Sequence, residues 1–242
     1  MAEPMPDDQV ERILIVTAHP DDVDFGTSAS VATWTAKGID VTYCIVTDGD
    51  AGGFDPAVPR SEIPRIRREE QTAAAKVCGV DDVRFLGYKD GELTVTHELR
   101  RDISRVIRQV KPQRMVIQSP ERNWERIYAS HPDHLAAGDA AIQAVYPDAR
   151  NPYAHPSLLR DEKLEAWTVG EVWIGGGPAP DHYVDVTDTI DYKLAALAAH
   201  ESQTAHMEDL EGMIRSWHAL NAERMGLPEG RLAEIFQVVN TA

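Results

Sequence analysis

The feature that most constrains the fold of this chain is a regular alternation of two patterns along its first two thirds. Short apolar runs, rich in β-branched residues, cover residues 12–17, 40–47, 82–86 and 114–118. Between these runs, apolar residues recur at helical spacing in residues 25–37, 61–78 and 97–110. Nearly continuous apolar strands that alternate with amphipathic helices predict a doubly wound α/β fold, in which helices cover both faces of a mostly parallel sheet.

After residue 145 the alternation becomes less regular. Three prolines in residues 146–156 indicate an ordered loop. A helix is expected at residues 188–220, and further strands at residues 166–174, 182–186 and 235–239. The sequence contains no internal repeat or low-complexity stretch. We therefore expect one domain over residues 1–242, with a Rossmann-like core at 1–145 and a strand-and-helix extension at 146–242 that completes the pocket.

The charge of the chain excludes several classes of partner. The formal net charge is −16, and a field of that sign repels phosphate backbones and anionic membranes, so we expect neither nucleic acid nor a membrane as partner. The amino terminus is acidic, and no run approaches the roughly 18 apolar residues of a membrane helix. Cys44 and Cys78, the two cysteines, indicate no disulfide framework. These features together predict a cytoplasmic protein.

Polar residues gather where the predicted strands end. In a doubly wound sheet, ligands bind beyond the carboxyl ends of the strands. The four junctions at or soon after these ends are AHPDDVDFG, TDGDAGG, LGYKDGE and ASHPDH. A dinucleotide site would need glycines in the first junction so that the backbone could approach a pyrophosphate, and none stands there before Gly26. The sequence therefore disfavours a nucleotide-binding protein.

The first and last of these junctions carry side chains that bind metals. The first holds one histidine and two adjacent aspartates within residues 19–22. The last holds His131 and His134, which share one face of a helix that Ser130 is expected to cap. A catalytic zinc takes three protein ligands and leaves one position open. One His and one Asp from the first junction, with one His from the last, supply that number.

Each junction alone has a simpler interpretation. Aspartates at residues 21 and 22 also suit the positive end of a helix, and Asp133 could form a capping box with Ser130. Two such junctions at the same edge of one sheet favour a shared metal site over two unrelated helix caps.

At these residues the sequence resembles the LmbE-like or PIG-L-like zinc N-deacetylases. That family is marked by A-H-P-D-D after the first strand and by a distant H-P-D-H, and both motifs stand here intact, at residues 18–22 and 131–134. The resemblance covers most of the chain and extends to TDGDAGG, the pair Arg67 and Glu70, LGYKDG and AHESQ. It implies hydrolysis of an amide by one Zn²⁺ or another divalent metal, namely deacetylation of an N-acetylglucosamine-type sugar derivative. Family members are often multimeric, so the resemblance also allows a homo-oligomer.

The resemblance also implies a role for nine residues. It implies that His19, Asp22 and His134 are the metal ligands and that Asp21 is the general base. His131 would assist the oxyanion and would be oriented by Asp133. The implied substrate contacts are Asp50, Arg67 and Asp90. From the sequence alone, Arg67 could instead form a surface pair with Glu70. Asp50 and Asp90 could equally stabilise the glycine-containing turns in which they stand.

Two departures from the family pattern leave the substrate open. Some relatives carry a tyrosine two residues before HPDH, where this chain has Ala129, with Tyr128 one position earlier. The run HPDDVDFG is closer to the LmbE and bacillithiol-type branch than to the mycothiol branch. An amidase acting on a larger N-acyl group or a thiol conjugate is therefore an alternative. A third hypothesis is a metal-dependent sugar-binding protein without turnover, which the presence of Asp21 disfavours.

Overall fold

Seven strands form one sheet in the computed structural model, which describes residues 3–242. The strands are β1 (Arg12–Thr17), β2 (Asp40–Thr47), β3 (Asp82–Tyr88), β4 (Arg114–Gln118), β5 (Glu171–Gly175), β6 (His182–Asp185) and β7 (Ala233–Asn240). Their order across the sheet is β3-β2-β1-β4-β5-β7-β6. All pairs among β1 to β5 are parallel, whereas β7 is antiparallel to both β5 and β6. The expected doubly wound, mostly parallel α/β fold is confirmed.

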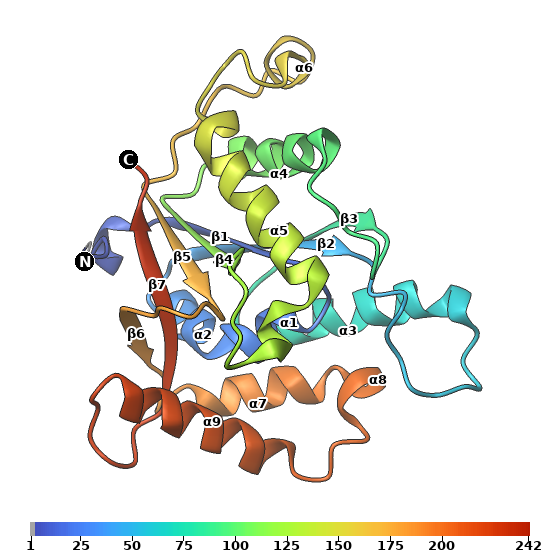
Figure 1. Ribbon diagram of the computed structural model, residues 1–242, viewed down its shortest axis with the longest axis vertical. Helices are drawn as coiled ribbons and strands as arrows, with labels where there is room; N and C mark the ends of the chain where they lie inside the picture. The colour runs from blue at the N-terminus through green and yellow to red at the C-terminus, as the bar shows by residue number, and fades with distance from the viewer. Residues whose placement is uncertain (1–2) are drawn as a thin grey trace.

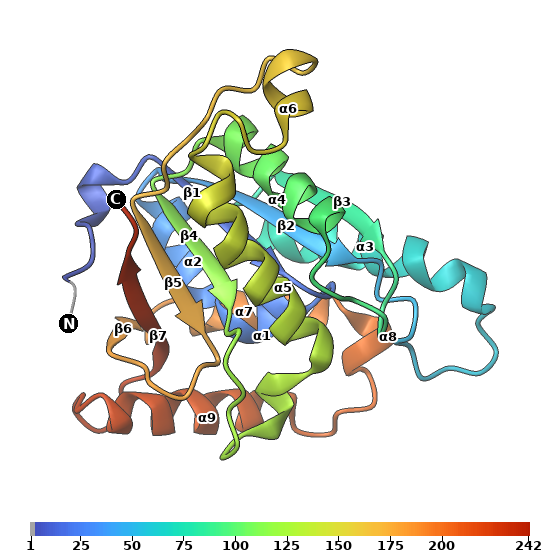
Figure 2. The same cartoon turned by 45° about the horizontal axis from the view of Figure 1, so that its top comes forward.

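Helices cover both faces of this sheet (Figures 1 and 2). One face carries α4 (His97–Val110) and α5 (Pro132–Gln143), and the other carries α2 (Ser28–Ala36), α3 (Ile63–Val77) and α7 (Ile190–Ala198). A further helix, α9 (Leu210–Arg224), packs on α7 and on β7. The shorter elements are α1 (Asp22–Gly26), α6 (Pro156–Arg160), α8 (Glu201–Thr204), η1 (Asp7–Gln9), η2 (Arg60–Glu62), η3 (Ile127–Ser130) and η4 (Ala144–Ala149). No helix within residues 3–242 is long and apolar enough to cross a membrane.

The central strands divide their apolar residues between two cores. In β1, Leu14 and Val16 pack with α4 and α5, while Ile13 and Ile15 pack with α2 and α3. Successive side chains of a strand point to opposite faces, so a strand covered on both faces is apolar at every position. This is why the sequence predicts β1, β2 and β4 with the bounds that the structure has.

The structure departs from the sequence-based expectation mainly in the extension. The helix expected at residues 188–220 is three helices, α7, α8 and α9, because new helices begin after His200 and after Asp209. Asp209 caps α9 by accepting a hydrogen bond from the backbone N of Gly212 at 3.0 Å. The strand expected at 166–174 begins only at Glu171, and the loop expected at 146–156 includes the end of η4.

The carboxyl ends of β1 and β4 lie side by side because these two strands pair directly. The backbone N of Ala18 donates to Oε1 of Gln118 at 2.8 Å, which ties the two strand ends together. Helix α5 then approaches the end of β4 so closely that a Cβ at Gly138 would collide with the carbonyl oxygen of Gln118. The junctions that carry the two histidine motifs therefore meet at one edge of the sheet.

Candidate metal centre

The first part of the site is the tight turn between β1 and α1. Asp21 has a backbone φ of 93°, a left-handed conformation that residues with a Cβ rarely adopt. Asp22 is the first residue of α1, and its Oδ2 accepts a hydrogen bond from the backbone N of His19 at 2.6 Å. The turn thereby brings Nδ1 of His19 within 3.3 Å of the Asp22 carboxylate.

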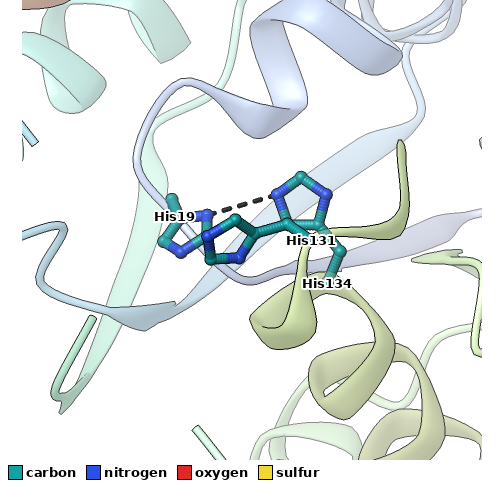
Figure 3. A group of neighbouring side chains, drawn as sticks. All are labelled: His19, His131 and His134. Atoms are coloured by element: carbon teal, nitrogen blue, oxygen red, sulfur yellow. Dashed lines mark hydrogen bonds between the residues drawn. The ribbon is translucent and has the colours of Figure 1, made fainter. Parts of the chain in front are cut away.

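The second part is the start of α5. His131 is the N-cap of this helix, and its Nδ1 accepts a hydrogen bond from the backbone N of Asp133 at 3.2 Å. The expectation that Ser130 caps the helix is wrong, because the Ser130 hydroxyl accepts from the backbone N of Asn123 at 2.8 Å instead. His134 lies within the first turn of α5 and faces the β1 turn (Figure 3).

Three donor atoms from the two junctions converge on one point. Nε2 of His134 lies 3.2 Å from Nδ1 of His19 and 3.0 Å from Oδ1 of Asp22. Lone pairs that face each other at such distances repel unless a proton or a metal ion lies between them. At zinc bond lengths of about 2.0–2.1 Å, the ligands of a tetrahedral site are separated by roughly 3.3–3.4 Å. The donor set and its spacing therefore fit a zinc ion.

Carboxylates also surround the other nitrogen of His19. Its Nε2 lies 3.0 Å from Oδ1 of Asp90 and 3.1 Å from Oδ2 of Asp133. Burial alone would lower the pKa of His19, but Asp22, Asp133 and Asp90 raise it to about 12. The environment thus strongly favours positive charge at this point. A ligand histidine whose second nitrogen is held by a carboxylate is the common arrangement around protein-bound metals.

The carboxylate of Asp133 contacts His19 and not His131. It also accepts hydrogen bonds from the backbone N of Gly91 at 2.7 Å and of Leu93 at 3.2 Å, in the segment that follows β3. Asp133 thus contacts His131 through its backbone N, whereas its carboxylate makes no hydrogen bond to that ring within the described residues. The alternative of a capping box between Asp133 and Ser130 is wrong, because the first turn of α5 points this carboxylate inward.

His19, His131 and His134 lie next to one another (Figure 3), and His131 is the exposed member of this histidine group. Its ring centroid lies 4.9 Å from that of His19 and 5.3 Å from that of His134. Because Nδ1 accepts a backbone N–H, the neutral ring carries its proton on Nε2. Burial, together with His19 and His134, lowers the pKa of His131 and favours this neutral form. Nε2 can therefore donate a hydrogen bond to a bound ligand.

The carboxylate of Asp21 lies beside the ligand group and is held by a buried cation. Nη2 of Arg67 donates to Oδ2 of Asp21 at 2.9 Å and also to the carbonyl oxygen of Pro20. Burial raises the pKa of Asp21 to about 6, although Arg67 opposes this. A carboxyl group with a pKa in this range can accept and release a proton near neutral pH.

The three residues expected to contact substrate all have protein partners. Arg67 is only 3% exposed and lies beneath Asp21, whereas the surface pair with Glu70 does not form, because Glu70 binds Ser202. Oδ1 of Asp50 accepts a hydrogen bond from the backbone N of Asp90 at 2.9 Å and so joins the loops that follow β2 and β3. Asp90 itself lies against His19.

A buried polar group made of Gln71, Asp24 and His200 contacts the backbone of Asp21, and the sequence does not predict it. Gln71 of α3, Asp24 of α1 and His200 before α8 are all fully buried and are joined by hydrogen bonds. No motif marks Gln71, Asp24 stands in the run HPDDVDFG without a role predicted for it, and AHESQ draws attention to His200 only as part of the family resemblance. Helical spacing offers one signal, since Gln71 stands one turn after Arg67 on α3.

Comparisons with known proteins identify relatives of the chain. The family profile described as "PIG-L: GlcNAc-PI de-N-acetylase" matches residues 14–145. The diacetylchitobiose deacetylase of Thermococcus kodakarensis is 33% identical over 198 residues, which cover 82% of this chain and 72% of that protein. A probable N-acetyl-alpha-D-glucosaminyl L-malate deacetylase 2 of Bacillus cereus is 31% identical over 226 residues, which cover 90% and 96%. The solved structure of N,N'-diacetylchitobiose deacetylase from Pyrococcus horikoshii matches with a TM-score of 0.88 at 28% identity, covering 97% of this chain and 86% of that one.

Proposed function

The chain belongs to the PIG-L family of de-N-acetylases, and from this membership we propose that it is a zinc-dependent deacetylase of a small N-acetylglucosamine derivative. The names of its relatives support the substrate class. They include deacetylases of diacetylchitobiose, of an N-acetylglucosaminyl malate and of an acetamido-glucopyranosyl inositol. The group attached to the sugar differs between these compounds, whereas the acetamido sugar is common to them.

The observation that carries the proposal is the convergence of His19, Asp22 and His134 next to a separately held carboxylate. The nitrogen and oxygen atoms of these three residues lie 3.0–3.3 Å apart, which suits them to hold the metal. Asp21 lies beside them but is bound to Arg67, so it is available for chemistry rather than for ligation. A site that only bound a metal would not need this second carboxylate.

The chemistry of the proposed reaction is hydrolysis of an acetamide. A zinc ion, when bound, lowers the pKa of water and polarises a carbonyl oxygen. Asp21 accepts a proton from the attacking water as the new C–O bond forms. Nε2–H of His131 donates a hydrogen bond to the oxygen on which negative charge develops. Asp21 then passes its proton to the departing nitrogen as the C–N bond breaks, which yields acetate and the free amino sugar.

The proposal is tested by metal analysis combined with acetate release. Protein prepared without chelators should contain about one zinc per chain and should release acetate from N-acetylglucosamine, N,N'-diacetylchitobiose or an N-acetylglucosaminyl glycoside. Chelation should abolish the release and added zinc should restore it, because ligands of the donor types present here bind that ion well.

The control substrate is an N-acetylated lysine peptide, which offers an acetamide without a sugar and should release no acetate. A zinc-loaded, folded protein that releases no acetate from any N-acetylglucosamine derivative would overturn the proposed function. Release from the peptide at the same rate would overturn the substrate class.

A further inference from the structure

Helix α3 holds both sides of the peptide bond that precedes Asp21. Nη2 of Arg67 donates to the carbonyl oxygen of Pro20, and Oε1 of Gln71 accepts from the backbone N of Asp21 at 2.7 Å. Arg67 and Gln71 stand four residues apart, so they lie on the same face of α3. The peptide is thus fixed by two side chains of one rigid element, while Arg67 also holds the carboxylate of Asp21.

The orientation of the Gln71 side-chain amide is fixed by Asp24. Its Nε2 donates to Oδ2 of Asp24 at 2.8 Å, and the same oxygen lies 2.7 Å from Nε2 of His200. A carboxylate offers acceptors only, so the NH₂ group of Gln71 has to face Asp24 and its oxygen has to face Asp21. His200 belongs to the extension after residue 145, which in this way reaches the β1 turn through Asp24.

The conformation that this group holds is one that the chain would otherwise avoid. Asp21 has a φ of 93°, and a side chain with a Cβ disfavours the left-handed region by steric contact. If the hydrogen bond from its backbone N were lost, Asp21 could move toward a commoner conformation, and its carboxylate would leave the position beside His19 and Asp22. The turn by itself does not determine where this carboxylate lies.

The buried group formed by Gln71, Asp24 and His200 is polar throughout. Oδ1 of Asp24 and Nδ1 of His200 are buried without a hydrogen-bond partner among the protein atoms that the structure describes. Apolar side chains could fill the same space, but they could not accept the hydrogen bond from the backbone N of Asp21.

We propose that Gln71 is a positioning residue for Asp21, with the direction of its amide set by Asp24 and His200. The proposal rests on the proposed function in assigning proton transfer to Asp21. It predicts that Gln71 affects the rate of the chemical step rather than the binding of substrate or metal, because its only described contact with the site is through the backbone of Asp21.

Two variants test this assignment in the full-length, zinc-loaded protein. Gln71→Met keeps the length of the side chain and removes both hydrogen bonds. The double variant Gln71→Glu/Asp24→Asn restores both hydrogen bonds. The new carboxylate still accepts from the backbone N of Asp21, and only the bond between residues 71 and 24 has its donor and acceptor exchanged. We expect Gln71→Met to lower kcat about 10²-fold with KM and zinc content unchanged, and the double variant to recover most of the loss. Gln113→Met is the matched control, since Gln113 also accepts a backbone N–H, that of Arg12, far from the site.

A second readout does not depend on turnover. Hydrogen exchange of the Asp21 amide should become faster in Gln71→Met than in the wild type and should slow again in the double variant. Wild-type kcat in folded Gln71→Met, or a folded double variant no more active than Gln71→Met, would overturn the positioning role. An inactive wild type would contradict the proposed function instead, and unchanged exchange in Gln71→Met would still overturn the positioning role.

Discussion

Two buried ionic groups of the molecule differ in how their charges balance. At the start of α2, Glu234 is paired with Lys193 at 2.6 Å, both side chains are fully buried, and His218 lies 3.8 Å away. At the candidate metal centre, the single side chain of His19 lies within 3.3 Å of three carboxylates. A fourth carboxylate, that of the neighbouring Asp21, is paired with Arg67.

The difference separates a structural group from a functional one. Glu234 has its charge neutralised by Lys193, and its oxygens accept from the backbone N of Ala29 and of Ser30 in the first turn of α2, where negative charge is favourable. It needs nothing from outside the chain. The metal centre has more carboxylates than cations, and a buried excess of negative charge is stable only if a cation is supplied. Charge balance, rather than burial, therefore distinguishes the two groups.

Asp21→Asn is expected to reduce catalysis strongly without loss of the metal. The variant keeps the shape of the side chain and an oxygen for Arg67, but it removes the base. We expect kcat to fall by about 10²–10⁴-fold while zinc content is retained, because Asp21 is not among the three proposed ligands. Steady-state acetate release with metal analysis on the same sample measures both quantities. Activity near that of the wild type would remove Asp21 from the mechanism.

A comparable effect on stability, with none on chemistry, is expected from Lys193→Met. It leaves Glu234 as a buried charge without its partner, which should lower the free energy of unfolding by about 3–5 kcal/mol. Chemical denaturation measures this loss, and activity per folded molecule should not change. Arg215→Met is the matched control, because the pair of Arg215 with Asp191 is exposed and should contribute at most about 1 kcal/mol. Equal losses in the two variants would show that burial of the pair has no consequence.

The pH dependence of the pair Glu234–Lys193 should give a smaller change in the free energy of unfolding. Burial alone would raise the pKa of Glu234, but Lys193 and His218 lower it from 4.5 to about 2. The ionised form is therefore the stabilising one. Its contribution, on the order of 3 kcal/mol, is complete above about pH 4.5 and is lost as the pH falls toward 2. The difference in free energy of unfolding between the wild type and Glu234→Gln should shrink over that interval. A difference that stays constant from pH 6 to pH 2 would contradict the assignment.

The sequence predicted the core of the fold better than the contacts of the site. Strands that are covered on both faces appear in the sequence as continuous apolar runs. The sequence therefore predicts the first and last residues of β1, β2 and β4 correctly. The edge that gathers the two histidine motifs also followed from the strand pattern, because the carboxyl ends of parallel strands meet. These predictions depend on local periodicity and on one general rule of α/β sheets.

Side-chain partners were less predictable, because they join segments far apart in the chain. Asp133 is one residue from His134 and two from His131, yet its carboxylate binds His19, 114 residues away. The sequence predicts that Arg67 contacts substrate or pairs with Glu70 at the surface, whereas Arg67 is buried under Asp21. For Gln71 the only local signal in the sequence is its position one helical turn after Arg67. Such contacts depend on how α3 and α5 pack on the sheet. The apolar periodicity of a helix predicts which of its faces is buried, but it does not predict which side chains of other elements that face contacts.

The position of β7 in the sheet affects how the chain folds. β7 follows β6 in the chain, yet it lies between β5 and β6. β6 therefore has no neighbour to pair with until a segment about fifty residues later has been added, and β5 keeps an open edge for the same time. Folding that waits on such distant partners is slow, and exposed strand edges in the meantime invite association with other chains. The steps most vulnerable to aggregation in this protein should thus be those that pair β7 with β5 and β6.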